Sequence, residues 1–586
     1  MKTAASELDR IRHTASHIMA QAISELFSDV KLAIGPTIEN GFYYDFDLKH
    51  AFTEDDLRRI EARMAEIVAA KLPVVQSLRP KAEALAYLKQ LNQPYKVEIA
   101  EGINEDQLSF FTQGSFTDLC GGPHVDNTER VMAFKLLKVS GAYWRGSEKN
   151  AMLQRVYGTA WSTHEDLQRH LETLVEAEKR DHRRLGVELD LFHISDETGP
   201  GLVFYHPKGA MLRHVLETYM YDQQLRRGYQ PVIIPHMARQ KLYETSGHNE
   251  FYRDKMFFTQ LDEQPYVIKP MNCPSHIMIY KSRRRSYREL PVRYFEFGTV
   301  YRYERSGVMH GLLRVRGFTQ DDGHIFCTLD QLAGEILSNL QAVDETMRLF
   351  GFTYEVYLST RPEKYVGQIE NWDRAEQALA EALARSGTPY QVDPGEGVFY
   401  GPKIDVKLKD ALGRVWQGPT IQVDFNLPQL FELEYVGSDS KMHTPVMVHR
   451  AIFGSFERFL GALIEHYAGA FPFWLAPVQI AVLPISDTVL GYAEQVAGLF
   501  RSQGYRVELD ASDEKIGAKI RQATLQKIPY MVVLGKREQE QQQLSLRHLK
   551  EGDLGSMTLD TVLERFAAEG KPQGTQSLKG GSLSQK

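Results

Sequence analysis

The sequence predicts an α+β protein of several domains, and three observations support that prediction. The chain has 586 residues, which corresponds to three or four domains of ordinary size. A central stretch, 293–326, alternates apolar and polar residues as a β-hairpin does, whereas the last hundred residues alternate strand-like and helix-like segments. The composition, 43% hydrophobic and 25% charged, is typical of an ordinary globular protein.

The net charge and the cysteine content indicate which partners and which cellular compartment the protein is suited to. The net charge of −7 gives no general attraction for nucleic acid, so an RNA-binding surface has to be made of local basic patches. Three cysteines, Cys120, Cys273 and Cys327, cannot form a disulfide framework, which favours a reducing compartment. The N-terminus does not have the pattern of a signal peptide and no stretch reaches the length of a membrane span, so we expect a cytoplasmic protein with no membrane partner.

The N-terminal part begins with a predicted helix over 6–27, in which apolar residues recur at helical spacing and form a buried stripe. His13 and His17 are four residues apart and share another face of that helix. Cys120 and His124 are also four residues apart, in the segment DLCGGPHVDNT. A surface histidine pair and a zinc site both remain open from these residues alone. A third interpretation, a hydrolytic site that requires no metal, depends on a resemblance given below.

A polar helix is expected next, over 162–184, where Ser162 and Glu165 form a capping-box pattern. Tyr219 to Pro235 then reads as a helix end, a turn and an apolar strand that stops at the proline. Cys273 follows a proline-bounded turn, and both His324 and His449 are far from it in sequence. Chemistry alone therefore favours a core cysteine over a metal ligand.

The central hairpin carries four arginines, which are Arg302, Arg305, Arg314 and Arg316. The pattern predicts a strand over 294–301, a glycine-containing loop over 306–311 and a second strand over 312–318. Glu304 lies two residues from Arg302, so the two side chains would share one face of a strand. Guanidinium groups bind phosphate in bidentate geometry and stay charged, which suits a triphosphate. Composition alone favours the alternative, an exposed hairpin with solvated arginines.

Several motifs together resemble those of the class II aminoacyl-tRNA synthetases. YRYERSGVMHGLLRVRGFTQDDGHIF is similar to motif 2, the Arg-x-Glu hairpin that holds ATP, and its end, GFTQDDGHIF, is similar to the threonyl-tRNA synthetase family. Residues 219–235 resemble motif 1, whose strand and proline lie at the dimer interface of the class, and GSFERF resembles motif 3. HTASHIMAQA, GFYYDF and DLCGGPHV look like the editing domain of that family. The resemblance covers nearly all of residues 6–570.

This resemblance implies a fold and a division into domains. The fold is a class II antiparallel sheet with flanking helices, an N-terminal α+β editing domain and a C-terminal α/β anticodon-binding domain with a mostly parallel sheet. The expected parts are the editing (seryl-tRNA deacylase) domain over 1–158, a linker helix over 159–181, the catalytic domain over 182–472, the anticodon-binding domain over 473–570 and a disordered tail over 571–586. Many members of the family begin with a small ubiquitin-like domain, which we expect this form to lack because His13 stands almost at the start.

The resemblance also implies the residues of the catalytic site. One zinc ion per subunit would be held by Cys273, His324 and His449. ATP with Mg²⁺ would be bound by Arg302, Glu304, Arg314, Phe318, Gln417, Thr420, Ser455 and Arg458. Threonine would be bound by Gln320, Asp322, Tyr400, Lys403 and Gln422. Open zinc positions would take the amino group and the hydroxyl of threonine. Such a site rejects valine, which has no hydroxyl, but accepts serine, so a separate editing site is needed.

Two further sites follow from the same resemblance. The editing residues would be His13, His17, Tyr44, Lys96, Asp118, Cys120 and His124, with a positioned water, a base such as His13 and a cation such as Lys96. Gly121 departs from the family, which carries a bulkier and often basic residue there. Anticodon contacts would be made by Asp513, Glu538 and Arg547. The family often has asparagine where Asp513 stands, and a carboxylate accepts hydrogen bonds but cannot donate them.

The implied function is a threonine–tRNA ligase that acts as a homodimer. It would activate L-threonine with ATP to threonyl-adenylate, transfer the threonyl group to the 3′ end of tRNA(Thr), and hydrolyse mischarged seryl-tRNA(Thr). Another class II enzyme such as a prolyl-tRNA synthetase is an alternative, although that family lacks the Cys273, His324 and His449 set. A synthetase-derived RNA-binding regulator is a second alternative, but such proteins usually lose Arg302 or Arg458, and both are present.

Overall fold

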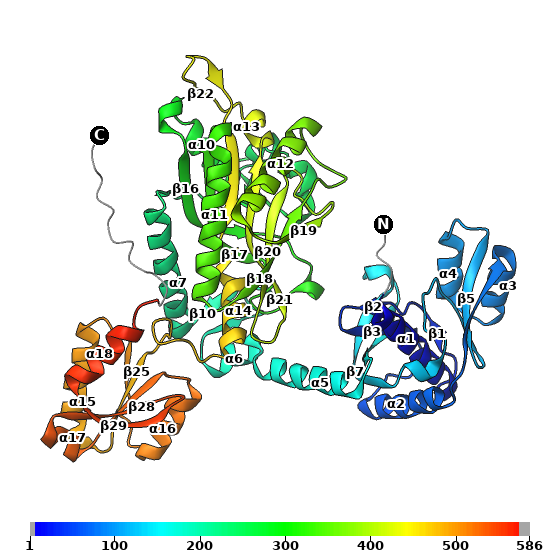
Figure 1. Cartoon of the computed structure of the whole chain (residues 1–586), viewed down its shortest axis with the longest axis horizontal. Coiled ribbons are helices and arrows are strands. Elements are labelled where there is room, and N and C mark those ends of the chain that lie inside the picture. The colour runs from blue at the N-terminus through cyan, green and yellow to red at the C-terminus, as the bar shows by residue number, and fades with distance from the viewer. Residues whose placement is uncertain (1–5, 573–586) are drawn as a thin grey trace. The chain divides into compact units, whose positions relative to one another are not determined.

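The structure is a computed structural model that describes residues 6–572, in two compact units that divide between residues 176 and 177 (Figure 1). The tail predicted to be disordered, 571–586, lies outside the described residues except for its first two positions. No helix within 6–572 combines the length and the apolar character needed to cross a bilayer. The mixed α+β architecture predicted from the sequence is confirmed.

The N-terminal unit contains two antiparallel sheets, of five strands in the order β1-β3-β8-β7 with β2 beside β3, and of three strands in the order β4-β5-β6. Its helices are α1 (Glu7–Leu26), α2 (Glu54–Ala69), α3 (Lys81–Gln90), α4 (Pro94–Gly102) and most of α5 (His164–Lys179). Its strands are β1 (Lys31–Leu32), β2 (Thr37–Ile38), β3 (Gly41–Asp47), β4 (Val74–Pro80), β5 (Gln107–Gln113), β6 (Phe116–Leu119), β7 (Ala133–Tyr143) and β8 (Met152–Trp161).

Helix α1 confirms the predicted helix and is buried more completely than its pattern indicated. A capping box closes its first turn, in which the Ser6 hydroxyl accepts from the Asp9 amide and the Asp9 carboxylate accepts from the Ser6 amide. The apolar stripe packs on β3 and β8, yet the polar face is covered too, and only 3% of His17 is exposed. The face that carries the two histidines is therefore internal, which excludes a surface histidine pair.

The linker helix begins one residue later than the capping pattern indicated. The Thr163 hydroxyl, rather than that of Ser162, accepts the helix amide, from Asp166, and α5 ends at Lys179. A separate short helix, α6 (His182–Glu188), follows with Asp181 as its N-cap. The single predicted helix over 162–184 is therefore two helices, because the chain turns at 180–181.

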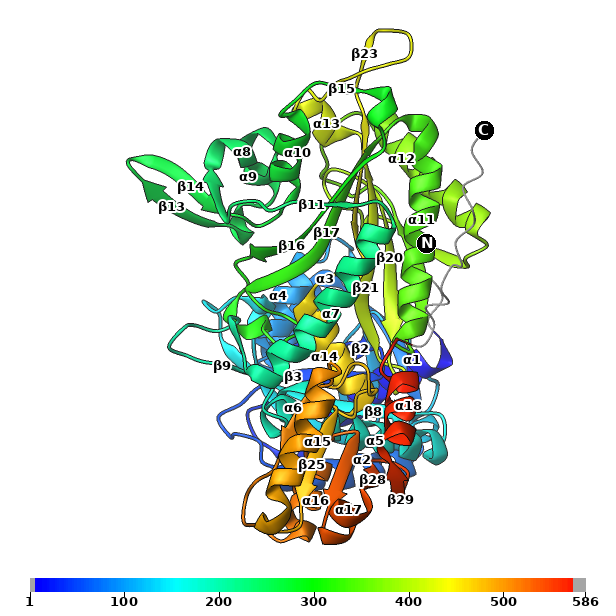
Figure 2. The same ribbon diagram turned by 90° about the vertical axis from the view of Figure 1, so that its left-hand side faces the viewer.

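The second unit is built on an eight-stranded sheet in the order β11-β16-β17-β24-β21-β20-β18-β19. Six central strands are antiparallel, and a parallel strand stands at each edge. In Figure 2, helices α11 and α12 lie on one side of this sheet and α8, α9 and α10 on the other. Its helices up to residue 472 are α6, α7 (Pro207–Arg226), α8 (Gln240–Thr245), α9 (His248–Phe251), α10 (Cys273–Lys281), α11 (Leu329–Leu349), α12 (Ile369–Ser386), α13 (Asn426–Leu430) and α14 (Phe456–Tyr467).

The strands of this region form the large sheet and three small ones. The large sheet contains β11 (Gln230–Pro231), β16 (Val292–Tyr301), β17 (Gly317–Cys327), β18 (Thr353–Ser359), β19 (Tyr390–Asp393), β20 (Lys403–Lys409), β21 (Val415–Asp424) and β24 (Val446–Ala451). The small sheets contain β9 (Phe192–Ile194) and β10 (Val203–Tyr205), then β12 (Met237–Arg239), β13 (Phe257–Leu261) and β14 (Gln264–Ile268), then β15 (Arg285–Ser286), β22 (Tyr435–Val436) and β23 (Met442–His443).

Alternation along the central strands gives the large sheet an apolar face and a polar face. The apolar face packs against α7, α11, α12 and α14 through residues such as Ile325, Ile421 and Val448. The neighbours of these residues in sequence, His324, Gln422 and His449, point to the opposite face. The fold therefore presents polar groups from several strands on one surface.

The hairpin that was predicted from the arginine-rich stretch has a longer connection than expected. Its first strand, β16, ends at Tyr301, but β17 begins only at Gly317, so 312–318 is not the predicted second strand. A 3₁₀ turn over Ser306–Val308 and further turns fill the connection. Arg302 and Glu304 consequently lie in the connection and not on one strand face. The strand predicted before Pro235 is also short, since β11 covers only two residues at the sheet edge.

The C-terminal part has a five-stranded sheet in the order β26-β25-β27-β28-β29, whose first three strands are parallel and whose last two are antiparallel. Helices α15 and α18 cover one face, and α16 covers the other. The helices are α15 (Leu490–Ser502), α16 (Ile516–Leu525), α17 (Lys536–Gln541) and α18 (Leu559–Glu569). The strands are β25 (Ile480–Pro484), β26 (Val507–Leu509), β27 (Tyr530–Leu534), β28 (Gln543–His548) and β29 (Gly552–Thr558). The predicted small α/β domain is confirmed.

Candidate functional site

A cavity of about 280 Å³ opens on the polar face of the large sheet. It is lined by nearly all the residues predicted to hold zinc, ATP or threonine, and the exceptions are Glu304, Arg314 and Lys403. The predicted residues that line it are Cys273, Arg302, Phe318, Gln320, Asp322, His324, Tyr400, Gln417, Thr420, Gln422, His449, Ser455 and Arg458. The structure thus gathers residues from α10, the three strands β17, β21 and β24, α14 and their flanking loops.

Strand register explains why residues that are remote in sequence meet here. His324 on β17 is paired with His449 on β24, which is paired in turn with Gln422 on β21. Two residues farther along these strands, Ala451 on β24 is paired with Asp322 on one side and with Thr420 on the other. Paired residues share a face of the sheet, so each row projects its side chains into one cavity.

A bulge accounts for two residues whose spacing does not fit one strand face. Gln417 and Thr420 are three residues apart and should point to opposite faces of β21. The pairing of β20 with β21 shifts between Asp405 and Lys407, and this irregularity brings both side chains to the Asp405 carboxylate. Both therefore line the cavity.

Cys273, His324 and His449 form a compact set of soft donors. Their potential ligand atoms all lie within 4.8 Å of one another, and all three residues are buried. Burial raises the pKa of the Cys273 thiol, and the nearby Asp322 and Asp424 carboxylates raise it further. The thiol is thus protonated without a cation, and a bound metal ion would favour the thiolate that coordinates it.

A second cavity, of about 380 Å³, shares Arg302, Phe318 and Arg458 with the first and adds Glu304 and Arg314. Glu304 accepts from Lys255 at 3.1 Å and from Arg314 at 3.1 Å. Burial lowers the pKa of Arg458, and the Arg302 and Arg314 guanidiniums lower it further. The cations therefore outnumber the carboxylate near this cavity, which favours a polyanionic ligand.

Gly454 allows the backbone before α14 to approach the sheet closely. Its φ of +80° lies in the left-handed region, and an added Cβ would stand 3.0 Å from the Gly418 carbonyl oxygen. Ser455 then caps α14 by accepting from the Arg458 amide. These contacts fix the first turn of the helix, from which Arg458 reaches the cavity.

Lys403 is the one residue predicted to bind threonine that does not line the cavity. It pairs with Gln422 across β20 and β21, but its ammonium group lies 2.7 Å from the Asp405 carboxylate. Asp405 in turn accepts from Gln417 at 3.0 Å. The Lys403 ammonium group is therefore connected to the cavity through Asp405 and Gln417.

A third group of potential ligands in the described residues, Asp181, His182 and Glu465, has no nitrogen left for a cation. Nδ1 of His182 donates to the Glu465 carboxylate at 2.6 Å, and its Nε2 accepts from the Leu312 amide at 3.0 Å. This buried contact ties α6 to α14 and to the connection that carries Arg314. Its role is structural.

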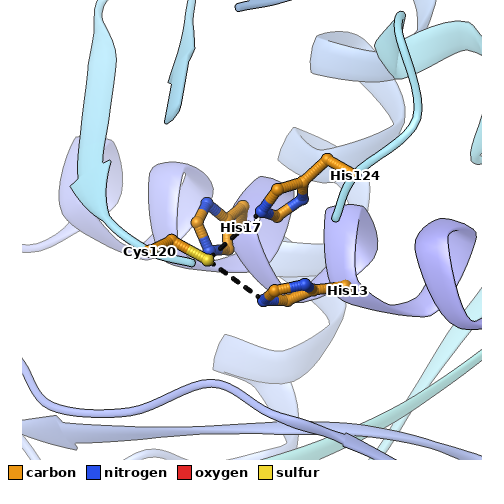
Figure 3. A group of neighbouring side chains, drawn as sticks. All are labelled: His13, His17, Cys120 and His124. Carbon is orange, nitrogen blue, oxygen red and sulfur yellow. Dashed lines mark hydrogen bonds between the residues drawn. The ribbon is translucent and has the colours of Figure 1, made fainter. Parts of the chain in front are cut away.

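In the N-terminal unit, His13, His17, Cys120 and His124 converge as predicted, and their potential ligand atoms lie within 4.8 Å of one another (Figure 3). The Cys120 sulfur lies 3.3 Å from Nε2 of His13 and 3.3 Å from Nε2 of His124. Gly122, with a φ of +65°, turns the chain after the cysteine, and its amide contacts the same sulfur at 3.3 Å. A cavity of about 440 Å³ adjoins the group.

Hydrogen bonds to the outer nitrogens assign the tautomers of two of these histidines. Nδ1 of His13 donates to the Pro123 carbonyl at 3.1 Å. The Thr14 hydroxyl donates to the Arg10 carbonyl at 2.9 Å and so accepts from Nδ1 of His124 at 3.2 Å. Both Nε2 atoms then carry lone pairs directed at one thiol. Because the thiol has a single proton, one imidazole keeps a lone pair for a water molecule or a substrate hydroxyl.

The charged part of this site is a buried ion pair. Lys96 contacts the Asp118 carboxylate at 2.7 Å, and the Tyr44 hydroxyl donates to that carboxylate at 2.6 Å. Nε2 of His17 is 3.7 Å from it. Burial lowers the pKa of His13 and His17, and burial raises the pKa of the Cys120 thiol to about 11. At neutral pH the site therefore combines neutral imidazoles and a thiol with the Lys96–Asp118 ion pair.

The residue that departs from the family pattern, Gly121, is not required by the local packing. A Cβ added there would meet no atom within 4 Å. It lines the cavity beside Cys120. The backbone thus accommodates a larger residue, and its absence leaves the polar side chains of the site in place.

The residues predicted to contact an anticodon are not all brought together. Asp513 follows the carboxyl end of β26, and Glu538 follows that of β27 and accepts from the Gly535 amide. Arg547 pairs with Met531 at the start of β27 and contacts Asp553 at 3.3 Å. Parallel strands bring the first two to one edge of the sheet, whereas Arg547 lies toward the other end of β27.

Three polar residues that support these sites were not predicted from the sequence. Thr14 orients His124, His276 contacts His324, and Asp424 contacts His449. One signal was present, because His276 is three residues after Cys273 and lies on the same side of α10. Thr14 lies between the two histidines of α1, whereas no sequence spacing connects Asp424 to His449.

Comparison with known proteins agrees with this architecture. Residues 256–467 match the family model described as "tRNA synthetase class II core domain (G, H, P, S and T)", and residues 479–569 match "Anticodon binding domain". Residues 108–157 match "Threonyl and Alanyl tRNA synthetase second additional domain". The first match falls in the large-sheet region, the second in the C-terminal part and the third in the N-terminal unit.

Similar proteins carry consistent names. The chain is 52% identical to a threonine–tRNA ligase of Oleidesulfovibrio alaskensis over 562 residues. This alignment covers 96% of this chain and 87% of that protein. A structure titled as the RNA binding domain of threonyl-tRNA synthetase from Cryptosporidium parvum is 40% identical, with a TM-score of 0.65 over 67% of this chain and 99% of that one. Giardia lamblia prolyl-tRNA synthetase shares the fold, at 17% identity and a TM-score of 0.54 over 68% of this chain and 80% of its own.

Proposed function

The chain belongs to the threonine–tRNA ligase family, and from that premise we propose that it activates L-threonine with ATP, transfers it to tRNA(Thr) and hydrolyses mischarged seryl-tRNA(Thr). The observation that carries the proposal is the cavity that unites most of the predicted ATP and threonine residues with a Cys/His/His donor set. Neither alternative is favoured, since the prolyl relative shares the fold alone and both Arg302 and Arg458 line the cavity.

Activation needs no side-chain nucleophile, because the threonine carboxylate attacks the α-phosphate and pyrophosphate leaves. The chain supplies position and charge instead. Tyr400 donates its hydroxyl proton to Gln422 at 2.8 Å, so its oxygen is left to accept from the substrate ammonium group. Arg302 and Arg458 line the cavity and would bind the polyphosphate of ATP, for which Mg²⁺ would supply further positive charge. The tRNA 3′-terminal hydroxyl then takes the threonyl group.

The three buried donors fit a zinc ion. Two imidazoles and one thiol are the ligand types that zinc prefers, and three protein ligands leave a position open, as in catalytic zinc sites. We therefore assign Cys273, His324 and His449 as the residues that would hold one zinc ion per chain. When bound, zinc would supply an open coordination position that distinguishes a hydroxyl from the methyl of valine.

We expect about one zinc ion per chain in the purified protein and threonine-dependent ATP–pyrophosphate exchange. Cys273→Ser should lose the metal and the exchange together, because one of only three protein ligands is removed. Elemental analysis of the dialysed protein measures the first effect, and the exchange assay measures the second.

A matched control is Cys327→Ser, since Cys327 is buried in the apolar core on the other face of the sheet. This variant should keep its zinc. Full exchange by metal-free protein would contradict the zinc assignment. Exchange that depends on proline instead of threonine would contradict the proposed function.

Editing is proposed for the cavity beside His13 and Cys120. One imidazole lone pair would take the proton of an attacking water, and the Lys96 ammonium would stabilise the negative charge that develops on the ester. Because Lys96 provides the cation, the site works as a hydrolytic centre that requires no metal. The C-terminal domain would bind the anticodon, through Asp513 and Glu538 at one edge of the sheet and Arg547 toward the other end of β27.

A homodimer and a cytoplasmic location complete the proposal. The single chain leaves apolar side chains exposed on α7, after β11 and at the start of β12, and we call them the apolar strip. They are Tyr221 and Leu225, Ile233, of which 92% is accessible, and Met237. A second copy of the chain would cover this strip, as motif 1 implies. The three free thiols suit a reducing compartment.

Ile233→Asp should weaken dimerisation by at least about tenfold, because burying one isoleucine contributes about 1.5–3 kcal/mol. Sedimentation equilibrium over a dilution series measures the dissociation constant. Leu525→Asp is the control, since Leu525 is 57% exposed in the C-terminal domain, away from this strip. Equal dissociation constants for the Ile233 variant and the parent would exclude this strip as the interface.

A further inference from the structure

Behind the cavity, a buried chain of polar residues leads away from His324. It consists of His276 on α10, Glu296 on β16 and Lys269, which precedes α10. All three are buried, with 0%, 7% and 1% of their surfaces exposed. None of them is among the residues that line the cavity. A substrate therefore cannot contact them directly, and any influence on the reaction passes through His324.

The distances define a continuous hydrogen-bonded chain. Nδ1 of His324 lies 2.7 Å from Nδ1 of His276, and Nε2 of His276 lies 3.2 Å from the Glu296 carboxylate. The other carboxylate oxygen accepts from the Ile234 amide at 3.1 Å, and the Lys269 ammonium lies 4.0 Å from it. At the end of this hydrogen-bonded series that is farther from the cavity, the Glu296 carboxylate is thus held by a backbone amide and lies near the Lys269 ammonium.

With neutral imidazoles, one arrangement of protons satisfies every contact in this chain of polar residues. A carboxylate accepts hydrogen bonds, so Nε2 of His276 must be the donor to Glu296. In a neutral imidazole the other nitrogen is then an acceptor, which makes Nδ1 of His324 the donor between the two rings. His324 therefore carries its lone pair on Nε2, the nitrogen that is not held by His276.

The opposite tautomer of His324 has no adequate partner. A proton on Nε2 would face the Asp322 carboxylate at 3.7 Å, which is too long for a hydrogen bond. His449 is oriented by an equivalent contact, because its Nε2 lies 2.9 Å from the Asp424 carboxylate. Asp424 is itself held by the amides of Asn426 and Leu427. Both histidines thus have one nitrogen occupied by a buried partner and one left to coordinate.

We propose that His276 and Glu296 are positioning residues that hold His324 in the tautomer able to bind zinc. The inference rests on the proposed zinc site and adds a function for two residues outside the ligand set. Outer partners of this kind fix ring orientation and tautomer, and their loss typically weakens metal binding by about 10–100-fold. Residues at the apolar face of the sheet, by contrast, would affect zinc only through overall stability.

Two substitutions of one residue separate hydrogen bonding from packing. In His276→Asn, the amide oxygen occupies the place of Nδ1 and can still accept from His324. In His276→Gln, the amide reaches the place of Nε2 and retains only the contact to Glu296. We expect zinc affinity to fall by about 10–100-fold in His276→Gln and by clearly less in His276→Asn. Competition with a chromophoric chelator measures the affinity.

The absorption spectrum of the cobalt-substituted protein provides an independent readout. It should change in His276→Gln, because an altered tautomer or ring orientation changes the metal's ligand field, and should resemble the parent in His276→Asn. Equal affinities in the two variants, whether both weak or both as tight as the parent, would overturn the proposal. If either His276 variant does not fold, Glu296→Gln replaces it in the test. The new amide group can donate to Nε2 of His276, which no longer forces His324 to carry its proton on Nδ1. Zinc affinity equal to that of the parent in Glu296→Gln would also overturn the proposal.

The parent protein and Cys273→Ser distinguish this inference from the proposed function. Parent protein without zinc would contradict the proposed zinc site itself. Parent protein that holds zinc, together with a Cys273→Ser variant that does not, establishes the ligand set and leaves the two His276 variants as the test of positioning. The melting temperatures of the metal-free variants show whether each has folded.

Discussion

Replacing Arg302 or Arg458 by alanine should lower the rate of threonyl-adenylate formation by about 10²-fold or more, on the scale of losing one preorganised partner of transition-state charge. Both side chains line the cavity. Burial lowers the pKa of Arg458, and repulsion by Arg302 and Arg314 lowers it further. A bound polyphosphate relieves that repulsion, so each arginine stabilises the charge that develops when pyrophosphate leaves. Threonine-dependent ATP–pyrophosphate exchange measures the effect.

Arg305→Ala is the matched control for both variants. Arg305 stands on the same connection between β16 and β17, but it is exposed and is not among the residues that line either cavity of this site. Its loss should leave exchange close to the parent rate. Hydrolysis of seryl-tRNA should survive all three changes, because the editing residues belong to the other unit. Unchanged exchange in the Arg302 and Arg458 variants would remove them from the ATP site.

The architecture could be predicted because local patterns encode it. Helical spacing gave α1 to within a residue at each end, and strand and helix alternation gave the C-terminal domain. The limits of pattern reading are visible in the same helix. A 3.6-residue period reports one apolar face, but it cannot report that a second layer covers the opposite face, so the burial of His17 was missed.

The site could not be derived from the residues alone, because its adjacencies arise across strands. His324 and His449 are 125 residues apart in sequence and directly paired in the sheet. Register is set by the packing of whole strands, and a shift of one residue would send both rings to the apolar face. Resemblance to a family supplied these positions, whereas spacing supplied none of them.

Resemblance in turn missed what depends on this chain's own contacts. Lys403 was expected to line the threonine site, but the Asp405 carboxylate holds its ammonium group at 2.7 Å. Strand periodicity, rather than the resemblance, had placed Arg302 and Glu304 on one strand face, but β16 ends before them. Two partners behind the ligands, His276 and Asp424, matched no motif, and only the hydrogen bonds to His324 and His449 reveal them.

A second site has to act after transfer because the catalytic cavity cannot exclude serine well. Serine retains the hydroxyl that a zinc ion or Asp322 would recognise and lacks only a methyl group. A missing methyl in a pocket is worth about 1–3 kcal/mol, or roughly 10 to 200-fold in selectivity. The N-terminal unit provides the second site, and its residues come from α1, β3, α4, β6 and the segment after β6.

We expect the double variant His13→Ala with Cys120→Ala to lose hydrolysis of preformed seryl-tRNA by about 10²–10⁴-fold, the range for removal of a positioned acid–base group. The two changes remove one imidazole acceptor and the thiol that it contacts at 3.3 Å, while Lys96 keeps its contact with Asp118. Threonylation should remain nearly intact, because the catalytic cavity is in the other unit. Given serine and ATP, the variant should accumulate seryl-tRNA.

His164→Ala is the control for the loss of a histidine in the same unit, since His164 is exposed in the first turn of α5. It should clear seryl-tRNA at the parent rate. Treatment of the parent with a chelator separates the two remaining interpretations of the His13, His17, Cys120 and His124 group. Hydrolysis that persists supports a site in which Lys96 supplies the cation, whereas hydrolysis that stops and returns with zinc indicates a metal site. Clearance of seryl-tRNA by the double variant at the parent rate would place editing outside this cavity.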